Sequence, residues 1–113
     1  MKGKWFFLIF MVMTMMSCDK CKDQPNDTTE KDYSTGLWMV NEGAFNGNNA
    51  SIDVRMPSGE LVRDVFQMVN GFPLGDVLQR VVVANDLAYA VLNNSNKVVV
   101  FKEKTFEWVR DMT

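Results

Sequence analysis

From Leu37 onward, short runs of apolar residues alternate with clusters of glycine, asparagine, aspartate and proline. Within several runs, apolar and polar side chains alternate, which is typical of β-strands that bury one face. Ile52, Val54 and Met56, for example, share one face of such a strand. The pattern predicts strands over residues 37–41, 51–56, 60–63, 80–84, 88–92, 97–101 and 106–111. The last four strands follow one another through tight turns, so we expect them to form an antiparallel meander.

One stretch departs from the strand pattern. Val62, Val65, Phe66 and Val69 fall at helical spacing, and Asp64 stands where a helix-capping residue would be. Two interpretations remain open: a strand that ends in a loop, or a short helix. Because the surrounding chain is rich in strand signals, we favour the strand and loop.

An internal repeat links the two halves of the strand region. Residues 37–42 match residues 88–93, with an aromatic side chain second and a valine fourth in each segment. Residues 51–54 match 97–100, and the triplet at 62–64 recurs at 109–111. Four strands per unit and a period in the forties are typical of β-propeller blades. The predicted fold is therefore all-β, with antiparallel four-stranded meanders that form about two blades of a propeller; a small antiparallel sandwich is the alternative.

The first 17 residues predict a signal peptide. Lys2 and Lys4 precede an apolar segment, residues 5–16, that is interrupted by one polar residue, Thr14. Twelve residues are too few to span a bilayer of about 30 Å. Because a small residue, Ser17, and then Cys18 follow, we expect a lipoprotein signal whose Cys18 receives the lipid; an ordinary signal peptide is the alternative.

Residues 18–35 predict a flexible tether between the anchor and the folded part at residues 36–113. The segment carries charges of both signs, one proline and no aliphatic residue after the cysteines, so it has little to bury. Asp27-Thr28-Thr29 is similar to a short O-glycosylation signal of some Gram-negative anaerobes, which makes Thr28 a candidate glycosylation site. A plain solvated linker is the alternative.

Composition excludes several classes of site. The chain has 12 Lys+Arg, 14 Asp+Glu and no histidine, so it cannot build Ser-His-Asp, Cys-His or histidine-bearing metal sites by itself. The near-neutral charge and the lack of a basic stripe argue against a nucleic-acid partner. No enzyme signature is found, so we expect a protein that is not an enzyme, with no metal and no cofactor.

Residues 88–101 resemble the YncE-like (YVTN) propeller repeat: a strand led by an aromatic residue, an Asn/Ser turn and a β-branched strand. Together with the segments at 40–43, 48–51 and 70–76, they resemble the N-terminal part of surface-layer-type propeller lipoproteins. The resemblance implies a lipid-anchored propeller of about seven blades, often encoded beside a TonB-dependent transporter; some relatives capture cobalamin at the cell surface. Two blades cannot close a propeller, so we expect a fragment or association with other copies.

Polar and aromatic residues in the loops are the candidates for ligand contact. Amide side chains around a glycine-rich loop could bond the polar rim of a corrinoid, and loop aromatics could stack on it. The alternative is turn chemistry, since asparagine and glycine tolerate positive φ. Trp38 occupies a repeat position, so we expect it between the sheets. The candidates are Asn41, Glu42, Phe45, Asn49, Phe72, Asp76, Asn93 and Asn94.

The expected function is that of a binding protein held at the outer membrane by its lipid, on the cell surface, with the periplasmic face as the alternative. It would capture a nutrient such as a corrinoid for a TonB-dependent transporter. Two other functions stay open: a structural envelope lipoprotein without a small ligand, or a propeller-type lyase or lactonase whose catalytic residues lie in further blades.

Overall fold

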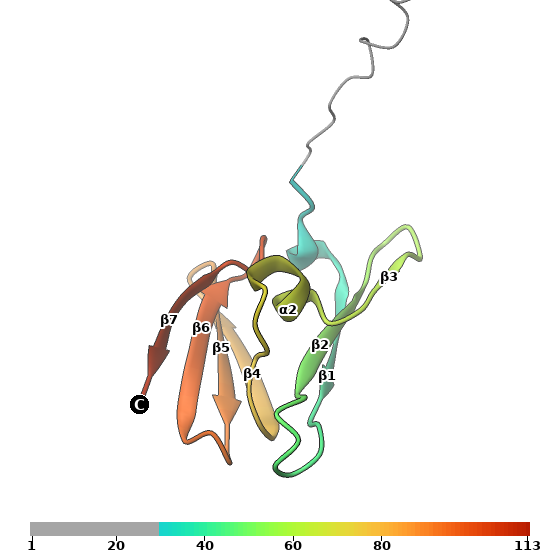
Figure 1. The fold of residues 1–113 in the computed structure, drawn as a ribbon. Helices are drawn as coiled ribbons and strands as arrows, with labels where there is room; N and C mark the ends of the chain where they lie inside the picture. The colour runs from blue at the N-terminus through green and yellow to red at the C-terminus, as the bar shows by residue number, and fades with distance from the viewer. Residues whose placement is uncertain (1–29) are drawn as a thin grey trace, which may run out of the picture.

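A computed structural model describes residues 30–113 (Figure 1). Two antiparallel sheets pack face to face, and one short helix covers one end of the space between them. The first sheet has the order β1-β2-β3 and the second the order β4-β5-β6-β7. The strands are β1 (Leu37–Asn41), β2 (Ser51–Arg55), β3 (Leu61–Val62), β4 (Leu78–Ala84), β5 (Leu87–Leu92), β6 (Lys97–Lys102) and β7 (Trp108–Met112).

These sheets confirm the prediction of an all-β fold built from antiparallel meanders. The first sheet has three strands where four were expected, and the second has all four. Asn85 and Asp86 both adopt positive φ at the β4–β5 turn, which is the conformation that matches a two-residue hairpin to the twist of its strands.

The internal repeat is visible in the strand register. In the first sheet Trp38 lies opposite Val54, and in the second sheet Tyr89, which matches Trp38 in the repeat, lies opposite Val100. The strands β1 and β2 therefore correspond to β5 and β6, residue by residue. The strand β4 has no counterpart in the first sheet, which accounts for the difference in strand number.

The prediction of a strand and loop after Val62 is wrong, because residues Val65–Asn70 form the helix α2. Val65 and Phe66 are fully buried, so tertiary packing of one helix face stabilises these six residues. Asp64 precedes the helix with a left-handed backbone, and its side chain makes no capping hydrogen bond. Gly71 ends the helix at φ 78°, where its N–H donates to the Gln67 carbonyl.

The core lies between the sheets and is centred on aromatic rings. The ring of Trp38 lies 4.6 Å from that of Phe106 and 6.0 Å from that of Phe101. The indole Nε1 of Trp38 donates to the Tyr33 carbonyl at 2.8 Å, so its one polar group is satisfied. Trp38 thus packs between the sheets, as the repeat predicts.

The folded part begins before residue 36. Tyr33–Thr35 form the 3-10 helix η2, and the Asp32 side chain accepts a hydrogen bond from the Ser34 N–H at 3.0 Å. Tyr33 is buried: its N–H donates to the Lys104 carbonyl at 2.8 Å and its ring lies 5.3 Å from that of Phe106. One aromatic side chain therefore fixes the end of the predicted tether to the second sheet.

The predicted signal peptide at 1–17, the predicted lipidation site Cys18 and the candidate glycosylation site Thr28 lie outside the described residues. Within residues 30–113, no helix has both the length and the apolar character needed to cross a membrane.

Candidate functional site

The segment Gly75-Asp76-Val77-Leu78 joins the two sheets at the end where β1 finishes and β4 begins. The Gly75 carbonyl accepts from the Ala50 N–H at 3.1 Å, and the Leu78 N–H donates to the Glu42 carbonyl at 3.0 Å. On its other side, the Val77 carbonyl accepts from the Asn93 N–H at 2.9 Å. We call residues 75–78 the junction segment, because it binds the long β1–β2 loop and the β5–β6 turn at once.

Asp76 is the buried polar residue of this segment, with 8% of its surface exposed. Its Oδ2 accepts hydrogen bonds from the Asn46 backbone N–H at 2.9 Å and from the Asn94 Nδ2 at 2.5 Å. The Asn94 amide also donates to the Asn46 Oδ1 at 2.8 Å, and the Asp76 N–H donates to the Ser95 Oγ at 2.8 Å. We call these four residues the Asp76 cluster; they connect segments that lie 18 and 30 residues from Asp76.

The second oxygen of Asp76 is buried and has no hydrogen-bond partner among the described residues. The carboxylate is therefore held by the two donors on Oδ2. Hydrogen bonds to a charged acceptor are stronger than neutral ones, so these two contacts fix the loop of the first sheet against the turn of the second.

The backbone of the junction segment is unusual on both sides of Asp76. Val77 has φ 56°, a left-handed conformation that is costly for a β-branched residue. Gly75 has φ 148°, and a Cβ there would lie 2.7 Å from the Leu92 Cδ1. The surrounding hydrogen bonds hold this strained geometry in place.

Two of the other predicted site residues bond within the β1–β2 hairpin. The Asn49 Oδ1 accepts from the Ala44 N–H at 2.8 Å, and the Asn41 Nδ2 donates to the Ser51 Oγ at 3.1 Å. The Asn49 contact is turn chemistry, which the sequence left open as the alternative to ligand contact, and the Asn41 contact joins opposite residues of β1 and β2.

Three predicted residues present exposed side chains at the same end of the sheets. Phe45 is 69% exposed on the β1–β2 loop, and Glu42 and Asn93 are also exposed. The backbones of Glu42 and Asn93 both bond to the junction segment, so they flank it. An open groove of about 600 Å³ lies beside it, lined by Val40, Glu42, Leu78 and Gln79.

Phe72 does not belong to this group. Its ring packs edge-on against Phe66 of α2 at 5.5 Å and lies 6.3 Å from Trp108 of β7. Asn70, which the candidate set lacks, supports this region: its Nδ2 donates to the carbonyls of Phe66 and Phe106, each at 2.9 Å, and its Oδ1 accepts from the Trp108 N–H at 2.8 Å.

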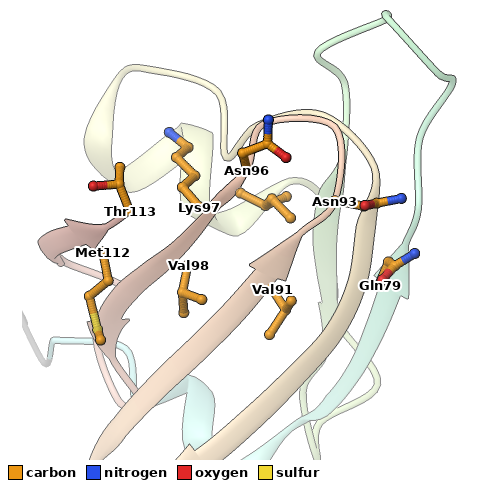
Figure 2. A pocket seen from close by; sticks show the side chains of 9 residues that line it. Gln79, Val91, Asn93, Asn96, Lys97, Val98, Met112 and Thr113 are labelled. Carbon is orange, nitrogen blue, oxygen red and sulfur yellow. The ribbon is translucent and has the colours of Figure 1, made fainter.

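A second hollow, of about 310 Å³, lies on the outer face of the second sheet (Figure 2). Val91, Val98 and Met112 form its apolar floor, and Asn93 and Asn96 stand at its rim (Figure 2). Lys97, which also lines it, donates to the Asp111 Oδ2 at 3.0 Å.

The charge at this hollow is balanced. Burial opposes ionisation of Asp111, but hydrogen bonds from the Trp108 indole and the Lys97 ammonium outweigh it and lower the pKa of its carboxyl. The hollow therefore has an apolar floor, and at one side the charges of Lys97 and Asp111 neutralise each other.

The sequence missed Asn46 and Ser95 as members of the Asp76 cluster, although both stand in the turns that it singled out. Among residues 30–113, no three histidine, cysteine, aspartate or glutamate residues lie close enough together to hold a metal ion. Amides, one exposed carboxylate and an exposed aromatic ring are groups that bind polar ligands.

No family model matches the chain, and a search of curated proteins finds no relative.

Proposed function

We propose that the chain is the N-terminal, two-sheet part of a lipid-anchored binding protein of the cell envelope, similar to YncE-like propeller lipoproteins. In this proposal Cys18 carries the lipid. The end of the sheets that carries the junction segment, the β1–β2 loop and the β5–β6 turn, which we call the loop end, faces away from the membrane. The protein captures a nutrient of the corrinoid class and delivers it to a TonB-dependent transporter in the outer membrane.

The observation that supports binding best is the arrangement of the loop end. The junction segment brings Glu42 and Asn93 to its two sides, and the exposed ring of Phe45 lies on the adjoining loop. Amide and carboxylate side chains can bond the amide-fringed edge of a corrinoid, and a phenyl ring can cover part of its flat face.

Titration with cyanocobalamin, followed by visible absorbance and by calorimetry, tests the ligand. Saturable binding that weakens in Glu42→Ala and Phe45→Ala is expected. Phe72→Leu is the matched control, because this ring lies against Phe66 and Trp108, outside the loop end. No heat and no spectral change at any concentration would reject the corrinoid.

The anchor is tested separately, with Cys18→Ser. The lipid should be lost, seen as a fall in intact mass, and the protein should leave the membrane fraction. Protease treatment of intact cells then distinguishes the surface from the periplasmic face, because only a surface protein is digested. A wild-type chain without the lipid mass would refute the anchor.

A structural envelope protein without a small ligand is the second candidate. The observation in its favour is that the Asp76 Oδ2 and the Asn94 amide already bond to each other, and the unpartnered Asp76 Oδ1 is buried, so neither oxygen is offered to solvent. A wild-type chain that is lipidated and surface-exposed but silent in the titration would favour this function.

A further inference from the structure

The chain contains two Asn-Gly dipeptides, Asn46-Gly47 in the β1–β2 loop and Asn70-Gly71 at the end of α2. In this dipeptide an asparagine loses its side-chain amide most readily. Glycine has no side chain to obstruct its own backbone nitrogen when that nitrogen attacks the Cγ of the preceding asparagine, and its backbone turns easily. Because the two sites share this chemistry, their surroundings decide which of them reacts.

The β1–β2 loop requires the glycine that makes Asn46 reactive. The Gly47 N–H donates to the Ala44 carbonyl at 2.7 Å and closes a turn in which Asn46 has φ 63°. A Cβ on residue 47 would lie 2.8 Å from the Ala44 carbonyl oxygen and 2.6 Å from the Asn49 Oδ1. The turn therefore excludes the larger residue that would shield Asn46.

The side chain of Asn70 is held in place on both of its polar atoms. Its Nδ2 donates to the carbonyls of Phe66 and Phe106, each at 2.9 Å. Its Oδ1 accepts from the Trp108 N–H at 2.8 Å, and the residue is half-buried. To react, Asn70 must break these three bonds before its Cγ can turn toward the Gly71 nitrogen, and each broken bond adds to the barrier.

The side chain of Asn46 is held less firmly. The residue is exposed, and within residues 30–113 its side chain forms one hydrogen bond, in which the Oδ1 accepts from the Asn94 Nδ2 at 2.8 Å. This bond lies on the oxygen, so it leaves the departing nitrogen unrestrained and draws electron density from the Cγ. The N–H groups of Gly47 and Gly71 each donate one backbone hydrogen bond, so the two nucleophiles do not differ in this respect.

We propose that Asn46-Gly47 is a modification site at which the folded protein converts its own asparagine into aspartate or isoaspartate. Hydroxide takes the proton of the Gly47 N–H, and the nitrogen then attacks the Asn46 Cγ. A bond from this nitrogen to Cγ forms, the Cγ–Nδ2 bond breaks, and the amide group leaves as ammonia with a proton from water. Water then opens the succinimide ring at one of its two carbonyls, so water is the one co-reactant and no electron is transferred. This inference is independent of the ligand and of the lipid anchor.

The product places a second carboxylate in the Asp76 cluster. The Asn94 Nδ2 donates to both the Asn46 Oδ1 and the Asp76 Oδ2, so the two acceptors share one nitrogen. With an aspartate at position 46, both acceptors carry negative charge, and no lysine or arginine of residues 30–113 forms an ion pair with Asp76. Because Asp76 is buried, the repulsion is screened less than at the surface. The modification therefore weakens the link between the β1–β2 loop and the β5–β6 turn.

The reaction is measured on the full chain, folded and in guanidinium chloride, during incubation in mildly alkaline buffer. Trypsin places the two sites on separate peptides, 32–55 and 64–80, and mass spectrometry with fragmentation locates the modified residue. In denaturant we expect both dipeptides to react at similar rates. In the folded protein Asn70 should react at least about tenfold more slowly than Asn46, because its hydrogen bonds add to the barrier. Part of the product at position 46 should be isoaspartate.

Asn46→Asp reproduces the charge of the product. It should lower the urea midpoint by about 1 M, because the new carboxylate faces that of Asp76. Asn48→Asp is the matched control: it adds the same charge to the same loop, outside the Asp76 cluster, and should shift the midpoint by less than about 0.3 M. In an Asp76→Asn background, Asn46→Asp should cost no more than this control, because one of the two charges is absent.

Two results would overturn the modification site. One is equal protection of Asn46 and Asn70 by folding, or faster loss of the amide at Asn70. The other is a product that contains aspartate without isoaspartate, since direct hydrolysis by water then replaces attack by Gly47. A midpoint of Asn46→Asp no lower than that of Asn48→Asp, or a shift that persists in the Asp76→Asn background, would overturn the effect on the link between the sheets.

Discussion

Asp76→Ala should lower the stability of the protein more than any other substitution at the loop end. The Asp76 carboxylate is 8% exposed, and its Oδ2 accepts two hydrogen bonds, from the Asn46 N–H at 2.9 Å and from the Asn94 amide at 2.5 Å. A hydrogen bond to a charged group contributes about 1.5–3 kcal/mol. Asn46 is exposed and Asn94 half-buried, so water replaces part of the loss, and we expect about 2–3 kcal/mol in total.

The double variant separates the contact from the cavity that alanine leaves. Asn94→Ala removes one of the two donors and should cost about 1 kcal/mol. Because Asp76 and Asn94 bond directly, the losses of stability in the two single variants should not add in the double variant. The double-mutant cycle should give a coupling energy of about 1 kcal/mol. Glu42→Ala is the control, since this exposed side chain on the adjoining loop should change stability by less than about 0.5 kcal/mol.

Urea unfolding followed by tryptophan fluorescence measures these values, with the partly buried Trp38 ring, which packs against the core, as the reporter. A slope of about 1 kcal/mol per molar urea is usual for a small domain, so Asp76→Ala should lower the midpoint by about 2–3 M. A midpoint within about 0.5 M of the original, or full additivity in the cycle, would refute the role of Asp76 as the link between the two sheets.

Three further predictions address the core, the backbone and the surface charges. Trp38→Ala should cost about 3–5 kcal/mol in urea unfolding followed by circular dichroism, because it removes a ring packed on Phe101 and Phe106; a loss below about 1 kcal/mol would contradict the packing. Gly75→Ala should lower the thermal midpoint, because its Cβ would lie 2.7 Å from a Leu92 methyl group and φ is 148°; an unchanged midpoint would be inconsistent with that close approach. A hydrogen bond from Lys102 lowers the pKa of Glu107 below its ordinary 4.5, so the small contribution of this ion pair to stability is complete above pH 4.5 and is lost as pH falls through the lowered pKa. Glu107→Gln should flatten that part of the profile of stability against pH. An identical acid slope in the variant would exclude the Lys102–Glu107 pair as its source.

The strands could be predicted from the sequence because their signal is local. Alternation of apolar and polar residues gave β2 as 51–56 against the observed Ser51–Arg55, and the turn residues placed the hairpins. The helix α2 was missed because its six residues span less than two turns, too few for a helical period to stand out from strand signals. Burial of Val65 and Phe66 between the sheets decides that conformation, and this packing exists only in the folded protein.

In the candidate site too, contacts between residues close in the sequence could be predicted, and contacts between distant residues could not. The contact between Asn49 and Ala44 closes within five residues, so the turn chemistry of the loop could be read from the sequence. The link between Asp76 and Asn94 spans 18 residues and forms because the two sheets stack. Phe72 lies in a loop, as predicted, and the contact of its ring with Phe66 could not be read from the sequence, because it forms only in the folded protein.

The occupied state of Asp76 determines where a ligand can bind at the loop end. A ligand that used its Oδ2 would have to displace the Asn46 N–H or the Asn94 amide, and each displacement costs a hydrogen bond to a charged group. The Oδ1 has no partner among the described residues, but it is buried, so a ligand could reach it only after the cluster opens. Contact with a ligand therefore falls to Glu42 and Asn93, whose side chains are exposed and whose backbones flank the junction segment. We expect Glu42→Ala and Asn93→Ala to weaken cyanocobalamin binding without lowering the urea midpoint, whereas Asp76→Ala lowers both. Calorimetry and urea unfolding on the same three variants check this separation, and a loss of binding confined to Asp76→Ala at unchanged stability would place the ligand on the carboxylate instead.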